Sequence, residues 1–207
     1  MRVRVFDYGA GNLHSLLKAL EGPGRELSVS TDPTAAVANS DVLVLPGVGA
    51  FAPAAARLEA GREAMRAAIR GGLPTLGICL GMQLMFDGSD EGVGAGLGVF
   101  AGRVTRLDAD RLPQIGWNAL EDSRDALFTA SGLDIAYYAN SFACRPEDHA
   151  AVIAWSQHGR DRFPAAVRAG RCVGVQFHPE KSSTPGRRFL EAFLEEARLV
   201  TSTSGLR

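Results

Sequence analysis

The fold is decided by the stretch Pro74-Thr75-Leu76-Gly77-Ile78-Cys79-Leu80-Gly81-Met82-Gln83-Leu84-Met85-Phe86. Residues 74–78 form a short apolar run of the kind that buried parallel strands have, and residues 82–86 fit a helix. Between them stands a cysteine with a glycine two positions away on either side. The stretch therefore predicts a buried strand that turns sharply at Cys79 into a helix.

The same alternation of strand and helix is found along the first half of the chain. Residues 3–6 and 42–45 are apolar runs, and each is followed by apolar residues at helical spacing. Asp32-Pro33 and Thr184-Pro185 each place a capping residue before proline, so helices are expected to begin there. Repeated βα units of this kind are typical of a parallel sheet.

The second half of the chain is richer in strands. Strands are expected over residues 99–107, 135–142, 151–155, 165–169 and 172–177. The glycine-dense segment 88–102 is expected to be a loop with a turn. Together the two halves predict an α/β fold of three layers, a mostly parallel sheet with helices on both faces and antiparallel additions. A chain of 207 residues, 46% of them hydrophobic, suits one domain over 1–200 with a flexible tail at 201–207.

Charge and cysteine content exclude several classes of partner. Lys and Arg total 22 against 23 Asp and Glu, so no net field favours nucleic acid or an anionic membrane. No signal peptide or membrane-spanning run is present in the sequence, which suggests a cytoplasmic protein. The three cysteines form no Cys-x-x-Cys pair, so neither a disulfide framework nor a metal site is expected.

A partial glycine fingerprint after the first strand imitates a nucleotide site. Gly9-Ala10-Gly11 opens a predicted helix, and Asp32 follows the next apolar segment, as in a dinucleotide-binding βαβ unit. The third glycine is missing, since His14 stands in its place. A tight turn is the simpler interpretation, and nucleotide chemistry is disfavoured.

Cys79 has the sequence context of an activated nucleophile. Gly-x-Cys-x-Gly between a strand and a helix matches a nucleophile elbow, in which the turn is strained and the glycines allow close packing. Amides at the start of the following helix would favour the thiolate, which is the reactive form. A small buried apolar residue is the alternative, and it is the expected role of Cys144 and Cys172.

His178 is placed to act as the base that a cysteine nucleophile needs. It follows the predicted strand 172–177, at the sheet edge where parallel α/β folds collect ligands. Glu180 lies two residues on, so in an extended segment its carboxylate points the same way and could bond the second ring nitrogen. A Cys-His-Glu triad is thus available, the alternatives being an exposed histidine and a plain surface carboxylate.

The loop after residues 42–45 could supply hydrogen-bond donors for an oxyanion. In Gly47-Val48-Gly49 the glycines permit backbone N–H groups to turn toward a ligand. Because this loop leaves a strand at the same edge as Cys79 and His178, we expect it to belong to the site. An ordinary strand-to-helix loop is the alternative.

With these residues assembled, the chain resembles the class I glutamine amidotransferases, whose elbow and His-Pro-Glu signature correspond to residues 77–81 and 178–180. Five blocks in the same order resemble, within that class, the glutaminase subunits of imidazole glycerol phosphate synthases. The blocks are Asp7-Tyr8-Gly9-Ala10-Gly11-Asn12 with Ser15, Pro46-Gly47-Val48-Gly49-Ala50-Phe51, Cys79-Leu80-Gly81-Met82-Gln83, Ile115-Gly116-Trp117-Asn118 and Gln176-Phe177-His178-Pro179-Glu180-Lys181-Ser182.

The resemblance implies an activity and a partner. Cys79, His178 and Glu180 would hydrolyse L-glutamine to glutamate and ammonia, with no metal or cofactor. The ammonia would pass to the cyclase subunit of the synthase, a (β/α)8 barrel that forms a heterodimer with the glutaminase in histidine biosynthesis.

The resemblance also assigns residues to the substrate and the partner. Those implied for the oxyanion and for glutamine are Gly47, Val48, Gly49, Leu80, Gln83, Asn140, Ser141 and Phe142. Asn12 and Lys181 are expected to face the cyclase. The chain departs from the family pattern at Gln114 and Asn140, where histidines are usual, and at Phe142, where tyrosine is usual.

Two alternatives remain open from the sequence. One is a glutaminase of the same fold that feeds a different synthase. The other is a noncatalytic regulatory subunit that keeps the fold.

Overall fold

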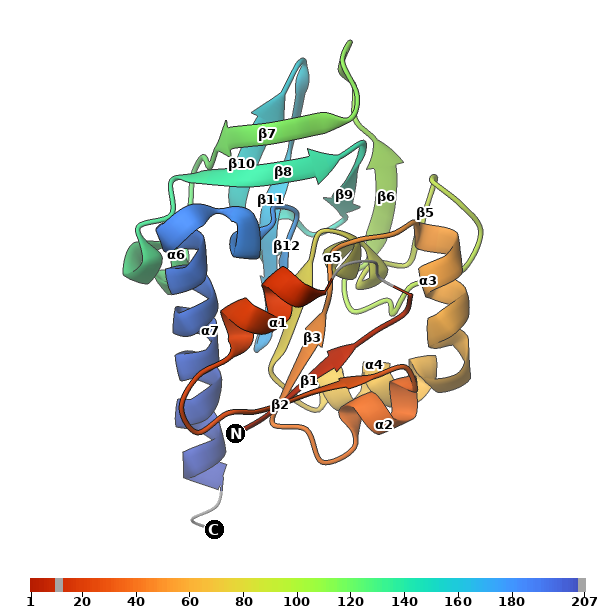
Figure 1. The fold of residues 1–207 in the computed structure, drawn as a ribbon. Coiled ribbons are helices and arrows are strands. Elements are labelled where there is room, and N and C mark those ends of the chain that lie inside the picture. The colour runs from red at the N-terminus through yellow and green to blue at the C-terminus, as the bar shows by residue number, and fades with distance from the viewer. Residues whose placement is uncertain (10–12, 205–207) are drawn as a thin grey trace.

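A seven-stranded sheet crosses the molecule in the computed structural model, which describes residues 1–9 and 13–204, with side chains through Leu199 (Figure 1). Its strand order is β10-β11-β12-β4-β3-β1-β2. The parallel strands are β1 (Arg2–Phe6), β2 (Glu26–Ser30), β3 (Val42–Leu45), β4 (Thr75–Ile78) and β12 (Cys172–Val175). The antiparallel additions at one edge are β10 (Val152–His158) and β11 (Asp161–Ala169).

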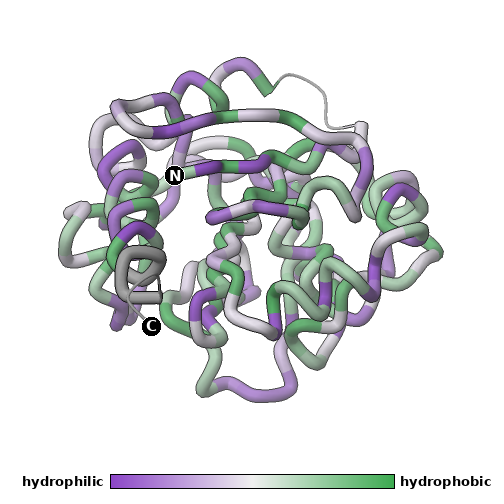
Figure 2. The backbone as a smooth tube through the Cα atoms, turned by 90° about the horizontal axis from the view of Figure 1, so that it is seen from below, coloured by the Kyte–Doolittle hydropathy of each residue, from purple (hydrophilic) through white to green (hydrophobic). Residues whose placement is uncertain are grey.

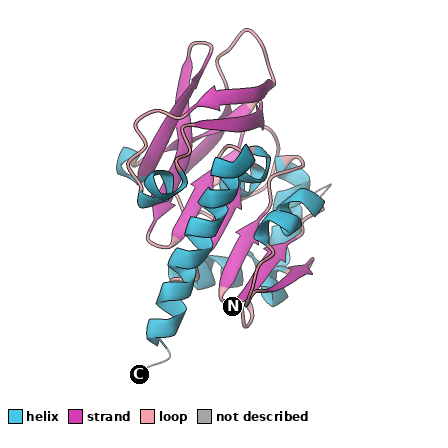
Figure 3. Cartoon of the chain, turned by 60° about the vertical axis from the view of Figure 1, so that its left-hand side comes forward, coloured by secondary structure: helices cyan, strands magenta, loops and turns pink. Residues whose placement is uncertain are grey.

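Helices cover both faces of this sheet. One face packs against α1 (His14–Leu20), α6 (Ala126–Ser131) and α7 (Ser183–Ser204). The other packs against α2 (Pro33–Val37), α3 (Phe51–Leu58), α4 (Arg62–Arg70) and α5 (Leu80–Leu84). Figure 3 brings α7 to the front, where it runs along the strands toward the C-terminus. The structure therefore confirms the predicted three-layer α/β fold.

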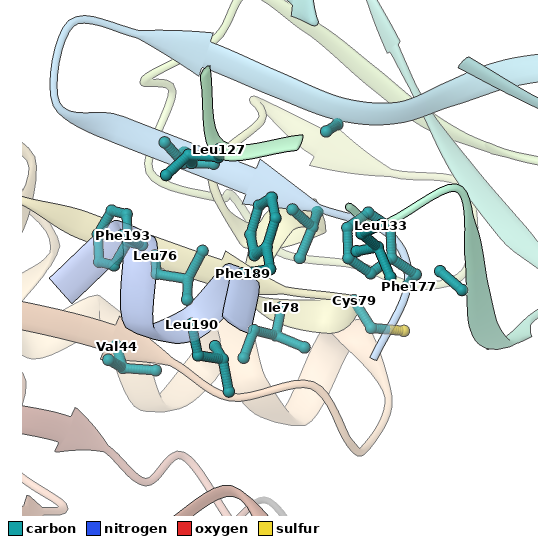
Figure 4. Packing of buried hydrophobic residues seen from close by; sticks show 14 of the residues in the cluster. Val44, Leu76, Ile78, Cys79, Leu127, Leu133, Phe177, Phe189, Leu190 and Phe193 are labelled. Carbon is teal, nitrogen blue, oxygen red and sulfur yellow. The ribbon is translucent and has the colours of Figure 1, made fainter. Parts of the chain in front are cut away.

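The core lies between the sheet and these two helix layers. Along α7, Phe189 and Leu190 pack on Leu76 and Ile78 of β4, and all four side chains are fully buried (Figure 4). Cys79 stands at the end of this cluster with its sulfur directed away from it. Seen from below in Figure 2, hydrophobic and hydrophilic residues alternate along the peripheral helices, as one-sided burial requires.

Two small sheets stand beyond the carboxyl ends of the parallel strands. One contains β5 (Gly88–Ser89), β6 (Gly102–Arg106) and β9 (Phe142–Pro146), and the other pairs β7 (Gln114–Ala119) with β8 (Ile135–Asn140). Figure 1 shows β7 and β8 at the top of the molecule, above β3. They form the upper wall of the site described below.

Several element boundaries differ from those expected. The strand expected over 99–107 begins only at Gly102, because the amides of Val99 and Phe100 both bond the carbonyl oxygen of Met85. The strand expected over 135–142 is two strands, β8 and β9, which pair in different sheets and are separated at Ser141.

One of the two predicted helix starts is confirmed, and the other is wrong. Asp32 caps α2 as expected, since its carboxylate accepts from the amides of Thr34 and Ala35. Helix α7 begins at Ser183, earlier than Pro185, because the carbonyl of Ser182 already accepts from the amide of Gly186. This helix continues to Ser204, so no helix end marks the boundary expected at residue 200.

Candidate active site

The turn at Cys79 has the strained geometry of a nucleophile elbow. Cys79 has φ +48° and ψ −103°, a backbone conformation that residues other than glycine rarely adopt. The chain leads directly from Cys79 into α5. The glycines at its flanks are required sterically. A Cβ at Gly81 would lie 2.1 Å from the carbonyl oxygen of Leu45, and one at Gly77 would lie 2.8 Å from the carbonyl of Gly81. The elbow therefore depends on both glycines.

Three adjacent parallel strands bring the candidate residues to one sheet edge. β12, β4 and β3 are neighbours, with Val175 opposite Ile78 and Leu45 opposite Gly77. The chain leaves these strands at the same level, toward His178, Cys79 and Gly47 respectively. A Cβ at Gly47 would lie 3.0 Å from Cε1 of His178, so this loop packs directly against the imidazole.

His178 is buried and held from several directions. Its Nδ1 lies 2.8 Å from Oε1 of Glu180, and this hydrogen bond fixes the orientation of the ring. Nε2 is thereby left to interact with the sulfur of Cys79. Its amide donates to the carbonyl of Tyr137, and its carbonyl accepts from the hydroxyl of Ser182 at 2.7 Å. Only 1% of the residue is exposed. The imidazole is therefore preorganised.

The electrostatics favour a charged imidazole at His178. Burial lowers the pKa of His178, but the hydrogen-bonded Cys79 sulfur and the Glu180 carboxylate outweigh burial, so the pKa is raised. The other two cysteines behave differently. Burial raises the pKa of the Cys144 thiol well above its ordinary value and that of Cys172 to about 12. Both are buried protonated thiols, as expected from the sequence.

A cavity of about 300 Å³ opens over Cys79 and His178. It brings together the residues that the resemblance assigned to the oxyanion and the substrate, namely Gly47, Val48, Gly49, Leu80, Gln83, Asn140, Ser141 and Phe142. Lys181 also lines it, while Glu180 lies behind His178. Asn12 lies outside the described residues.

Two of the three positions that depart from the family pattern face each other. Gln114 and Asn140 are cross-strand partners in β7 and β8, and each is 5% exposed. The side-chain amide of Asn140 donates to the carbonyl of Phe142 at 3.0 Å. This local bond helps to end β8 at Asn140, so that Ser141 and Phe142 turn along the cavity wall.

Two polar residues that the sequence analysis did not single out belong to the site. Glu91 lines the cavity, and its Oε2 accepts from the amide of Phe51 at 2.9 Å, at the start of α3. Nε2 of Gln176 lies 3.3 Å from Sγ of Cys79. Gln176 precedes His178 by two residues, so the alternation of an extended segment was the signal for it. Glu91 lies in an irregular loop that carries no comparable signal.

Within residues 1–9 and 13–204, no helix is long and apolar enough to cross a membrane. The same part of the chain contains no group of three or more His, Cys, Asp or Glu side chains arranged to hold a metal ion.

Residues 4–197 match the family described as glutamine amidotransferase class-I. The chain therefore belongs to the class I glutamine amidotransferases. It is 46% identical over 195 residues to the imidazole glycerol phosphate synthase subunit HisH of Symbiobacterium thermophilum, covering 91% of each chain. The subunit of the same name from Synechococcus sp. (strain JA-3-3Ab) is 42% identical over 203 residues, 94% of each chain. A crystal structure of a glutamine amidotransferase shares the fold, with a TM-score of 0.72 at 22% identity over 94% of this chain and 98% of the other.

Proposed function

We propose that this chain is the glutaminase subunit of an imidazole glycerol phosphate synthase, and that Cys79, His178 and Glu180 are its catalytic residues. The observation that carries the proposal is the strained elbow at Cys79 with His178 and Glu180 aligned behind it. Close relatives named as subunits of that synthase support the choice of subfamily. The products are glutamate and ammonia.

The mechanism follows from the order of these groups. The Cys79 thiol gives its proton to Nε2 of His178, and the sulfur bonds to the carboxamide carbon of L-glutamine. Amides of the Gly47-Val48-Gly49 loop and of Leu80, the first residue of α5, stabilise the oxyanion. His178 then protonates the departing ammonia, and water hydrolyses the γ-glutamyl thioester. Proton transfer contributes about 10²–10⁴-fold to the rate.

Glu91 gives the cavity a means of recognising the amino-acid end of glutamine. A free amino acid carries an ammonium group, and Glu91 places a carboxylate on the cavity wall. Its position is fixed because the same carboxylate caps α3 through the amide of Phe51. We propose that Glu91 binds the α-ammonium of glutamine, while Gln83 and the segment Asn140-Ser141-Phe142 line the rest of the substrate.

The cyclase is proposed to dock on the outer face of β7 and β8. Trp117 and Tyr137 are cross-strand neighbours on that face, with ring centroids 6.2 Å apart. The ring centroid of Tyr137 in turn lies 6.5 Å from that of His178. Nζ of Lys181 lies 5.8 Å from the ring centroid of Tyr137. This face thus runs from exposed apolar residues to the catalytic cavity, which suits a partner that collects ammonia. Asn12, expected to face the cyclase, remains part of this proposal.

We further propose that the protein works in the cytoplasm. All three cysteines are free thiols, as is usual where thiols are kept reduced.

Single cysteine substitutions test the proposed nucleophile. In complex with the cyclase, Cys79→Ala should lower glutamine hydrolysis by more than about 10³-fold, whereas Cys144→Ala and Cys172→Ala should retain it. Glutamate and ammonia release are measured directly. A glutamine-mimicking electrophile such as diazo-oxo-norleucine should label the wild-type chain at Cys79 and leave Cys79→Ala unlabelled. Hydrolysis retained by Cys79→Ala would end the proposal.

A further inference from the structure

Gln176 is a wholly buried polar residue beside the candidate nucleophile. It follows β12 directly, and its amide donates to the carbonyl of Ala165, which anchors its backbone to β11. Its side chain extends between two residues of the cavity. Nε2 lies 3.3 Å from Sγ of Cys79, and Oε1 lies 3.3 Å from Nε2 of Gln83. A buried amide with both ends bonded is fixed in place.

The direction of these hydrogen bonds is set by a backbone carbonyl. Nε2 of Gln83 lies 3.3 Å from the carbonyl oxygen of Phe142, which can only accept, so Gln83 presents its nitrogen on this side. The same nitrogen donates to Oε1 of Gln176. The nitrogen of Gln176 therefore faces the sulfur, and the chain of donors runs from Gln83 through Gln176 to Cys79.

A donor in this position acts differently on the two states of the sulfur. An N–H group stabilises a thiolate more than a neutral thiol, since bonds to an ionised acceptor are stronger. His178 has a separate task, because it takes the thiol proton. The titratable groups that face the sulfur or line its cavity are His178 with Glu180 behind it, Tyr8, Cys144, Glu91 and Lys181. Gln176 adds a donor that does not titrate.

We propose that Gln176 is a positioning residue, which aims the Cys79 sulfur and stabilises its thiolate through the side-chain N–H group, while Gln83 holds Gln176 in the donating orientation. The inference rests on the proposed function, since it assumes that Cys79 is the nucleophile. In the attack, the thiol proton moves to His178, the S–C bond forms and the carbonyl π pair moves to the oxyanion. The oxyanion then collapses, the C–N bond breaks, and His178 gives the proton to the leaving ammonia. When water hydrolyses the thioester, His178 takes a proton from the water, the new C–O bond forms, the S–C bond breaks and the thiolate returns to the N–H group of Gln176.

The test uses two substitutions in the complex with the cyclase, in a Cys144→Ala, Cys172→Ala background that leaves one reactive thiol. Gln176→Met removes the donor without adding charge, and Gln176→Glu removes the donor and places a carboxylate of the same shape by the sulfur. Alkylation of Cys79 by iodoacetamide is followed against pH. The midpoint of the profile should move upward by about one pH unit in Gln176→Met and further in Gln176→Glu.

Turnover provides the second readout. At neutral pH, kcat for glutamine should fall by about 10-fold or more in Gln176→Met and recover in part as the pH is raised, with KM nearly unchanged. Gln157→Glu is the matched control, because Gln157 is exposed. Among the described residues, its side chain hydrogen-bonds only to the carbonyl of Gly159. It should leave the alkylation profile and kcat as they are in wild type.

A third variant keeps the test informative where the substitutions at residue 176 fail to fold. Gln83→Met removes the donor that orients Gln176, and alkylation needs no glutamine, so substrate binding does not enter the measurement. The midpoint should again move upward, by less than in Gln176→Met. Unchanged midpoints in the folded variants overturn the inference even if turnover falls, because a purely structural role predicts that outcome. Only hydrolysis by Cys79→Ala overturns the proposed function itself.

Discussion

Glu180 shares a hydrogen bond with Nδ1 of His178 through one carboxylate oxygen, and its second carboxylate oxygen is buried without a hydrogen-bond partner among the described residues. The carboxylate therefore has two effects, orienting the ring and stabilising its charged form. Both effects depend on the negative charge. An amide of the same shape keeps the packing but can turn its NH2 group toward Nδ1, which enforces the wrong tautomer.

We expect Glu180→Gln to lower kcat for glutamine hydrolysis by about 10²–10⁴-fold with little change in KM. Steady-state kinetics of the complex with the cyclase measure both constants. Glu147→Gln is a matched control, since Glu147 is exposed and follows β9 at the end opposite Phe142, which lines the cavity, and it should behave as wild type. Equal kcat values for Glu180→Gln and wild type would show that the Glu180 side chain contributes only packing and that its charge has no part in catalysis.

Glu91 allows binding to be separated from chemistry. Glu91→Gln keeps an oxygen for the amide of Phe51 and removes the charge proposed to bind the α-ammonium of glutamine. KM should rise by about 10–100-fold while kcat changes little, because a charged hydrogen bond contributes about 1.5–3 kcal/mol. A substrate analogue without the ammonium group should show no difference between variant and wild type. A fall in kcat at unchanged KM would contradict the assignment.

Local spacing made some of these residues predictable and left others hidden. Cys79, His178 and Glu180 follow predicted strands at fixed positions, so the parallel sheet alone brings them to one edge. Glu91 could not be predicted, because its loop is shaped by backbone bonds to distant residues, such as that from the amide of Leu97 to the carbonyl of Leu84. Gln176 begins one of the five blocks that resemble the family, but only the structure shows what its side chain contacts.

At the scale of elements, an ion-pair cluster ties the antiparallel edge to one helix layer. Arg168 of β11 donates to Glu196 of α7 at 2.7 Å and 3.1 Å and to Asp125 at 3.1 Å. Asp125 is also the N-cap of α6, accepting from the amide of Leu127. One arginine thus holds β11, α6 and α7 together. Its side chain and that of Asp125 are largely buried, so solvent screens the pair little.

Arg168→Met should lower the free energy of unfolding by about 1–3 kcal/mol, because it leaves the buried carboxylate of Asp125 without its cation. Urea denaturation at neutral pH measures the change. Arg160→Met is the control, since Arg160 pairs with Asp108 and Asp110 at the surface and should give no measurable change. Similar losses in the two variants would contradict a special role for the buried cluster. The kcat of folded Arg168→Met should match wild type.

Strands were predictable where one hydrophobic pattern covers a single strand. They were not predictable where the pairing partner changes within one such pattern. β3 is a continuous apolar run, β4 is buried throughout, and both lie where the sequence analysis expected them. One strand was expected over residues 135–142, yet β8 pairs with β7 and β9 with β6, so the break at Ser141 is a tertiary effect. Sequence patterns describe single segments, whereas such pairing depends on residues far apart in the chain.

At the scale of the whole molecule, the outer face of β7 and β8 is unusually apolar for a surface. Ile115, Trp117 and Ile135 are 68%, 54% and 55% exposed, and the pairing of Trp117 with Tyr137 places these side chains on one face. Clustered exposed apolar residues mark interaction sites. The face adjoins Lys181 and the cavity, so a partner bound there would lie beside the cavity.

Trp117 should be the dominant contact of this face, because a large aromatic side chain at the centre of an interface contributes most of the binding energy. We expect Trp117→Ala to raise the Kd for the cyclase by about 30-fold or more, corresponding to about 2 kcal/mol. Calorimetric titration of the two subunits measures the Kd. Val29→Ala is the control, since Val29 is 45% exposed on β2 at the far edge of the sheet, and it should bind as wild type. Because docking is proposed to serve catalysis at the adjacent cavity, glutamine hydrolysis by Trp117→Ala should regain the wild-type rate at saturating cyclase. An unchanged Kd would place the partner on another surface.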